Sequence, residues 1–132
     1  MIRQWVAFWD RREPATSLAL VRVLVGLVVL FDLSIAWWLG LVPDLWAPPP
    51  QGLGFGAVDA HPPLVVRWLG ATARTAELTW VAGAVSAAML ATGTLTRVAA
   101  VVCAFASVEL ASLAPNSDRG IDAALRIACV LL

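Results

Sequence analysis

Charged residues interrupt the apolar stretches of this chain, at positions where an ionised side chain is costly. Asp32, Glu109 and Arg126 lie inside such stretches, and Asp122 precedes Arg126 by four residues, on the same face of a helix. A charge at the centre of a membrane costs at least about 2.5–3.5 kcal/mol, so each needs a partner, water or an interface. Counted at about 1.5 Å per residue, Asp32, Glu109 and Arg126 lie at similar depth. We therefore predict that Asp32, Glu109, Asp122 and Arg126 form a polar cluster that faces the interior of a helical bundle.

Two interpretations of this cluster remain open. The charges would pair with one another and fix the register of the helices, with no catalytic role. Alternatively, the layer would receive the headgroup of a quinone or lipid that enters from the loop side. None of the Walker, GxSxG, HExxH or GxGxxG patterns occurs, so phosphate, hydrolase and dinucleotide chemistry of the soluble type has no support.

Two further candidates lie in predicted loops. His61 is the only histidine and would act as a base or a ligand, or simply be solvated, but no second ligand stands at metal-binding spacing. Asn116 begins a polar turn that does not meet the calcium-binding EF-hand pattern. Cys103 and Cys129 lie in apolar stretches without ligand spacing, which is typical of buried thiols. We predict no metal site.

The composition places these residues in a membrane protein. The chain has 132 residues, of which 61% are hydrophobic and 14% charged, and its mean hydropathy is +0.84. Soluble chains average about 45–50% apolar and about 25% charged residues. The nine acidic residues balance nine arginines, and there is no lysine, so the chain lacks the basic excess of a nucleic-acid-binding protein. Its hydrophobicity also excludes a disordered chain.

The apolar stretches predict the elements that position the candidate residues. Residues 15–39 would form a first membrane-spanning helix of about 37 Å. A cleaved signal peptide is the alternative, but its apolar region would measure only about 7–15 residues. Residues 1–14, with tryptophans and arginines, favour a short interfacial helix. Prolines and glycines in residues 40–76 indicate an extramembrane loop.

The second half of the chain predicts a helical hairpin and a shorter helix. Residues 77–95 and 98–114 would cross the membrane, separated by Thr96 and Arg97. The apolar run 121–132 is too short to cross, so we expect the start of a fourth span. The expected fold is a single all-α domain over residues 1–132: an integral membrane bundle of three full transmembrane helices and an incomplete fourth. Arginines near the first span favour a cytoplasmic N-terminus.

Several segments, taken in order, resemble the N-terminal half of the HTTM domain, the membrane domain related to vitamin K-dependent gamma-carboxylase. Their order and spacing carry the resemblance, which covers essentially the whole chain. The segments are residues 8–14 (FWDRREP), 17–23 with Arg22, 26–33 with Asp32, His61-Pro62, 90–93 with Thr96-Arg97, Asn116, and 120–126 with Asp122 and Arg126.

The resemblance implies a multi-helix membrane domain with more spans than this chain holds, so the chain would be a truncated portion. Carboxylases of the family use a lysine to abstract a proton from reduced vitamin K, and this chain has no lysine. We therefore expect an integral membrane protein of the bacterial inner membrane without independent catalysis and without a predicted cofactor. A reduced quinone would be its cofactor only by resemblance. The alternatives are a quinone- or lipid-modifying enzyme and a small subunit, similar in scale to the DoxX family, completed by a partner chain or a second copy.

Overall fold

The computed structural model describes residues 15–50, 52–54, 62–114 and 120–131. Helices and no strand occur in this part of the chain, so the predicted all-α class is confirmed there. The predicted interfacial segment 1–14 and the candidates His61 and Asn116 lie outside the described residues. The described helices are α2 (Ala15–Trp38), α3 (Leu41–Trp46), α4 (Leu64–Leu69), α5 (Ala73–Thr92), α6 (Thr96–Leu113) and α7 (Gly120–Leu131).

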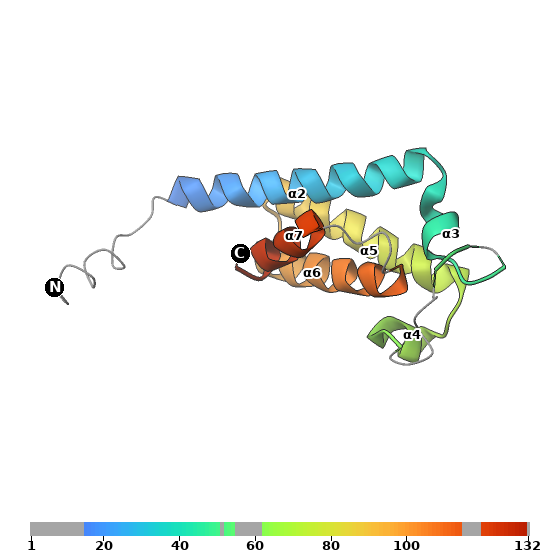
Figure 1. Ribbon diagram of the computed structural model, residues 1–132. Helices are drawn as coiled ribbons and strands as arrows, with labels where there is room; N and C mark the ends of the chain where they lie inside the picture. The colour runs from blue at the N-terminus through green and yellow to red at the C-terminus, as the bar shows by residue number, and fades with distance from the viewer. Residues whose placement is uncertain (1–14, 51, 55–61, 115–119, 132) are drawn as a thin grey trace.

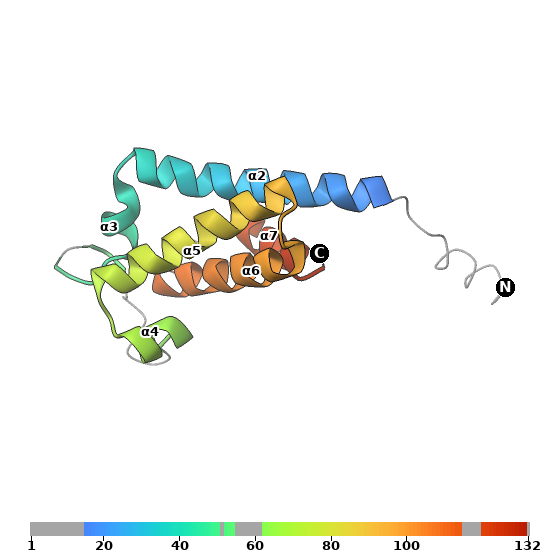
Figure 2. The same ribbon diagram turned by 180° about the vertical axis from the view of Figure 1, so that it is seen from behind.

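Three long helices run side by side and a shorter one completes the bundle (Figure 1). Helix α5 packs between α2 and α6, while α7 packs against α6 and α2 on the opposite side (Figure 2). The short helices α3 and α4 gather at the end of the bundle where α2 finishes and α5 begins. This end holds the described part of the predicted extramembrane loop.

Small residues allow α2 and α5 to approach closely. A Cβ atom added at Gly26 would lie 2.6 Å from the backbone nitrogen of Ala91 and 2.8 Å from the carbonyl oxygen of Ala87. One turn earlier on α5, a Cβ at Gly83 would meet side chains of α2 and α6 at 3.3 and 3.4 Å. The small residues at spacing of four on α5 therefore form a contact surface between its two neighbours, as small residues do in membrane bundles.

Helix α5 begins earlier than the predicted span 77–95. Thr72 stands at its N-cap, and the Thr72 hydroxyl accepts a hydrogen bond from the backbone nitrogen of Thr75 at 3.2 Å. This cap adds Arg74 and Thr75 to the first turn, ahead of Glu77. The helix ends at Thr92 because Gly93 adopts a left-handed conformation, with φ of 82°. A three-residue turn, 93–95, then leads into α6.

Two described helices, α2 and α6, are long and apolar enough to cross a membrane, whereas three were expected. Polar residues in the first two turns of α5 lower its apolar character. Only 22% of the apolar window of α2 and 39% of that of α6 are buried, whereas a core helix of a soluble protein is mostly buried. Large apolar side chains instead face outward along both helices, among them Leu20, Leu27, Phe31, Val101 and Phe105.

The described part of the predicted loop 40–76 contains two short helices, α3 and α4. Helix α3 follows Gly40, which turns the chain at the end of α2 in a left-handed conformation with φ of 69°. Pro43 is the third residue of α3, within the first turn, where a missing backbone N–H breaks no intrahelical bond. Helix α4 begins directly after Pro63, its N-cap residue, and ends before Gly70. Proline is therefore compatible with both helices because it lies at the N-cap or within the first turn.

Candidate functional site

Glu109 is a buried carboxylate that holds the beginning of α4. Its side chain projects from the last turns of α6 and is only 4% exposed. Oε1 accepts a hydrogen bond from the backbone nitrogen of Leu64 at 3.2 Å, and Oε2 accepts one from Val65 at 3.0 Å. These are the first two residues of α4, whose N-cap residue, Pro63, provides no capping side chain. Glu109 therefore supplies the missing cap from a different helix.

This arrangement explains how a carboxylate is tolerated in an apolar bundle. The first amides of a helix have no intrahelical acceptor, and a negative charge next to them is stabilised by the helix dipole. Hydrogen bonds to both oxygens compensate part of the loss of hydration. Glu109 thus links α4 to α6 across 45 residues of sequence.

Arg126 and Glu109 line the same cavity. Its volume is about 440 Å³, and it opens between α4, α6 and α7. The remaining lining side chains are apolar: Leu64, Ala104, Phe105, Val108 and Ile127. Arg126 is half-buried on α7. The structure therefore brings two members of the predicted cluster, one acidic and one basic, to the wall of one apolar cavity.

The other members of the predicted cluster are placed differently. Asp32 lies on α2 with an exposed side chain, which differs from the interior position expected for it. The difference arises because Val29, Leu33 and Ala36 of α2 turn toward the core, leaving Asp32 on another face of the helix. Asp122 belongs to α7, but its side chain lies outside the described residues, as do His61 and Asn116.

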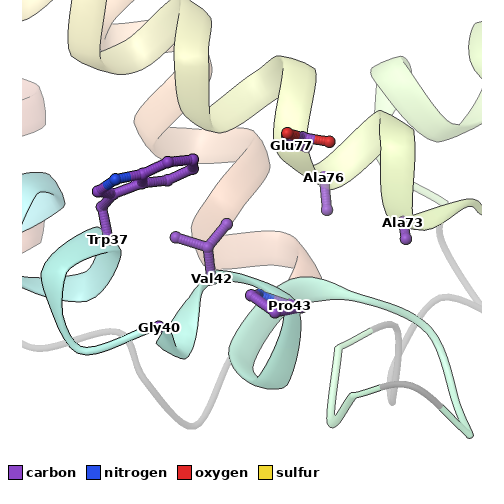
Figure 3. Close-up of a pocket in the computed structure, with 7 residues that line it drawn as sticks. All are labelled: Trp37, Gly40, Val42, Pro43, Ala73, Ala76 and Glu77. Atoms are coloured by element: carbon purple, nitrogen blue, oxygen red, sulfur yellow. The ribbon is translucent and has the colours of Figure 1, made fainter.

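A second cavity, which the sequence did not indicate, lies at the loop end of the bundle (Figure 3). Its volume is about 350 Å³, and residues from α2, α3 and α5 line it together with Gly40. Trp37 and Glu77 are its aromatic and ionisable members. Trp37 lies near the end of the predicted span 15–39, and Glu77 begins the predicted span 77–95. The Thr72 cap was the available signal that Glu77 lies one turn inside α5 rather than at its start.

Arg22, at the other end of the bundle, packs against the turn between α5 and α6. Its Nη1 donates to the Thr96 hydroxyl at 3.4 Å, and a Cβ at Gly93 would lie 2.7 Å from Nη2. The left-handed Gly93 therefore leaves room for the guanidinium. Arg22 is half-buried, and this contact connects α2 to the helical hairpin.

Two thiols meet between α6 and α7. Cys103 is completely buried and Cys129 is 3% exposed, and the two side chains lie next to each other. Both cysteines are free. Among the described residues, no three side chains of His, Cys, Asp or Glu gather in a way that would hold a metal ion.

Comparisons with protein-family models, with curated protein sequences and with solved structures give no match for this chain. A functional assignment therefore rests on the arrangement of its own residues.

Proposed function

We propose that this chain is an integral membrane helical unit of the HTTM type without catalysis of its own, in which α2, α5 and α6 cross the bilayer and α7 packs beside them. The observation that carries the proposal is the outward apolar surface of α2, of whose apolar window 22% is buried. Soluble monomers rarely expose contiguous apolar patches of more than a few hundred Å². In lipid the same surface is stable without a protein partner.

The position of α5 supports its role as the third crossing helix. The turn 93–95 joins α5 to α6, so the chain reverses direction between them. Because the turn is so short, a helix joined in this way to a membrane-crossing helix must itself run through the bilayer in the opposite direction. Its 20 residues span about 30 Å, the thickness of a hydrocarbon core. Buried hydroxyls of α5 bond to backbone carbonyls, with Thr79 donating to Thr75 at 2.8 Å and Ser86 to Gly83 at 2.9 Å.

The geometry of Glu109 supports a structural rather than a catalytic role. Both carboxylate oxygens already accept hydrogen bonds from the backbone of α4. A general base would have to release one of these bonds before it could take a proton from a substrate. The chain also has no lysine, the residue type that the resembling carboxylases use as a base. The function we infer is therefore to hold the loop-end helices on a membrane bundle.

A quinone- or lipid-modifying activity is the second candidate, and the 440 Å³ cavity favours it. The cavity is apolar except for Glu109 and Arg126, which suits a molecule with an apolar body and a polar head. If this activity exists, quinone addition will give a saturable binding signal that Arg126→Leu weakens. An equal signal from both proteins would reject this candidate.

The experiment that tests the leading proposal is fractionation of cells that express the full chain. We expect recovery in a bacterial inner-membrane fraction and resistance to sodium carbonate washing. Release into the soluble fraction would overturn the proposal. Labelling of a cysteine introduced at Leu53, in the extramembrane segment, reports sidedness: a cytoplasmic N-terminus places that label outside. Cross-linking in native membranes distinguishes a monomer from a complex with a second copy or with a partner chain.

A further inference from the structure

The cavity at the loop end combines an aromatic ring, a carboxylate and an apolar wall (Figure 3). Trp37 comes from the last turn of α2, and Glu77 comes from the second turn of α5. Between them, the side chains of Val42, Pro43 and Ala76 form part of the wall. The volume of about 350 Å³ falls in the range of about 300–1,000 Å³ that is typical of small-molecule sites.

Contact with α5 fixes the ring of Trp37. The indoles of Trp37 and Trp80 stack with their centroids 4.9 Å apart and an angle of 22° between their planes. Trp80 thus covers one face of Trp37, although Trp37 remains 57% exposed. The ring therefore lines the cavity in a held orientation, which reduces the entropy that a ligand would have to remove on binding.

Glu77 offers a negative charge that no described residue neutralises. Its side chain is exposed, and no ion pair or hydrogen bond to it occurs in the described part of the chain. The nearest charged residue along α5 is Arg74, which lies one turn earlier and does not line the cavity. None of the lining residues is basic. The site thus has one formal charge, and that charge is negative.

We propose that this cavity binds the ammonium headgroup of an amphiphile, and specifically of a membrane lipid. An organic cation is attracted both to the face of an indole and to a carboxylate. The apolar wall suits the methylene groups next to the ammonium. Arg74 lies three residues before Glu77 on α5, so a phosphate bonded next to the ammonium group would have a cation within one helical turn. An anionic headgroup would meet Glu77 directly and be repelled.

The choice of a lipid as the source of the ammonium group rests on the proposed membrane function. If α2 and α5 cross the bilayer, the ends that line this cavity lie at the membrane interface. Trp37, Trp38 and Trp68 all lie at this end of the molecule, and indoles concentrate at such interfaces. A headgroup in the cavity would place its acyl chains along the outward apolar face of α2. A soluble amine would contact the same Trp37 and Glu77 side chains but would gain nothing from an apolar tail.

The binding test uses the full chain in dodecyl maltoside micelles, so that its result does not depend on membrane crossing. The probe is hexyltrimethylammonium, titrated calorimetrically, with the heat of addition to empty micelles subtracted. We expect saturable binding that is weaker for hexanesulfonate, which has the opposite charge, and for tetramethylammonium, which has no tail. Equal binding of hexanesulfonate would overturn the proposal. Equal binding of tetramethylammonium would overturn the assignment to a lipid.

Variants locate the binding in this cavity. We expect Trp37→Leu to weaken binding about two- to fivefold, which is the loss of an exposed cation–π contact. Glu77→Gln should weaken it by about two- to fivefold through loss of an exposed ion pair. The matched controls Trp68→Leu and Asp44→Asn remove an exposed indole and an exposed carboxylate that do not line the cavity, and both should bind as the unmodified chain does.

A more conservative variant distinguishes a loss of folding from a loss of binding. If circular dichroism shows that Trp37→Leu loses helicity, Trp37→Phe keeps an aromatic ring and should retain most of the affinity. Unchanged binding by both Glu77→Gln and the folded Trp37 variant would overturn the site. Carbonate extraction of the chain would instead contradict its membrane function and leave the micelle measurement as a separate result.

Discussion

Among the single residues, Glu109 is both a candidate for chemistry and a contact that holds two helices together. A buried carboxylate in an apolar helix suggests catalysis or an ion pair, yet both of its oxygens bind backbone amides of α4. A catalytic role and a capping role for this carboxylate have different consequences. A catalytic carboxylate is required for turnover, whereas a capping carboxylate is required for the position of another element.

Replacement of Glu109 therefore should release the start of α4. In Glu109→Ala, the amides of Leu64 and Val65 lose their acceptors, and we expect a destabilisation of about 1–3 kcal/mol. Hydrogen–deuterium exchange at these two amides should accelerate, with Glu109→Gln intermediate because one amide oxygen remains as an acceptor. Asp44→Asn, an exposed carboxylate on α3, is the control. Unchanged exchange in Glu109→Ala would contradict the capping role.

The two cysteines allow a second measurement at this scale. Cys103 and Cys129 are buried against each other, so a water-soluble maleimide should label neither in native membranes and both after denaturation in SDS. Ser112→Cys introduces a thiol at an exposed position of the same helix and should be labelled under native conditions. Comparable native labelling at all three positions would show that α7 does not cover α6 as described.

At the scale of elements, the approach of α2 to α5 depends on the absence of a side chain at Gly26. A Cβ there meets backbone atoms at 2.6 and 2.8 Å, and backbone does not move aside as a flexible side chain would. We expect Gly26→Val to destabilise the bundle by about 1–3 kcal/mol, measured by thermal unfolding in detergent. Leu27→Val changes the adjacent, exposed residue and should have an effect within about 0.5 kcal/mol. Equal stability of the two variants would contradict this packing.

At the scale of the whole molecule, the outward apolar faces distinguish a membrane protein from a soluble one. Leu27 is 50% exposed on α2, near the middle of the helix. In water, Leu27→Arg would be nearly neutral. In lipid, it should cost at least about 2.5–3.5 kcal/mol and reduce the membrane-integrated fraction. The control Leu53→Arg alters a leucine that is 83% exposed in the segment predicted to lie outside the membrane and should integrate normally. Equal integration of both would argue against α2 as a crossing helix.

Composition and local pattern were sufficient to predict the class of the fold. Helical class follows from the length of the apolar runs, because each run must satisfy its own backbone hydrogen bonds wherever it lies in lipid. The position of α2 follows from Pro14 and Gly40. A hairpin between the next two helices was also predictable, but its turn lies at residues 93–95, and Thr96 and Arg97, the expected break, begin α6. The Thr72 cap of α5 and the Gly40 cap of α3 are also local features of the sequence, but the density of prolines and glycines favoured a loop over residues 40–76.

Contacts between distant parts of the chain follow from the packing of the helices and not from local sequence. The burial of Glu109 against backbone amides of α4, the exposure of Asp32, and the cavity between Trp37 and Glu77 all depend on residues about 40 or more positions apart. Depth along a helix can be counted from sequence, but the direction of a side chain around the bundle is set by how neighbouring helices pack. Composition and the length of the apolar runs therefore predict an apolar, helical chain. The packing of the helices then sets which of its few polar side chains support the fold and which remain available to a ligand.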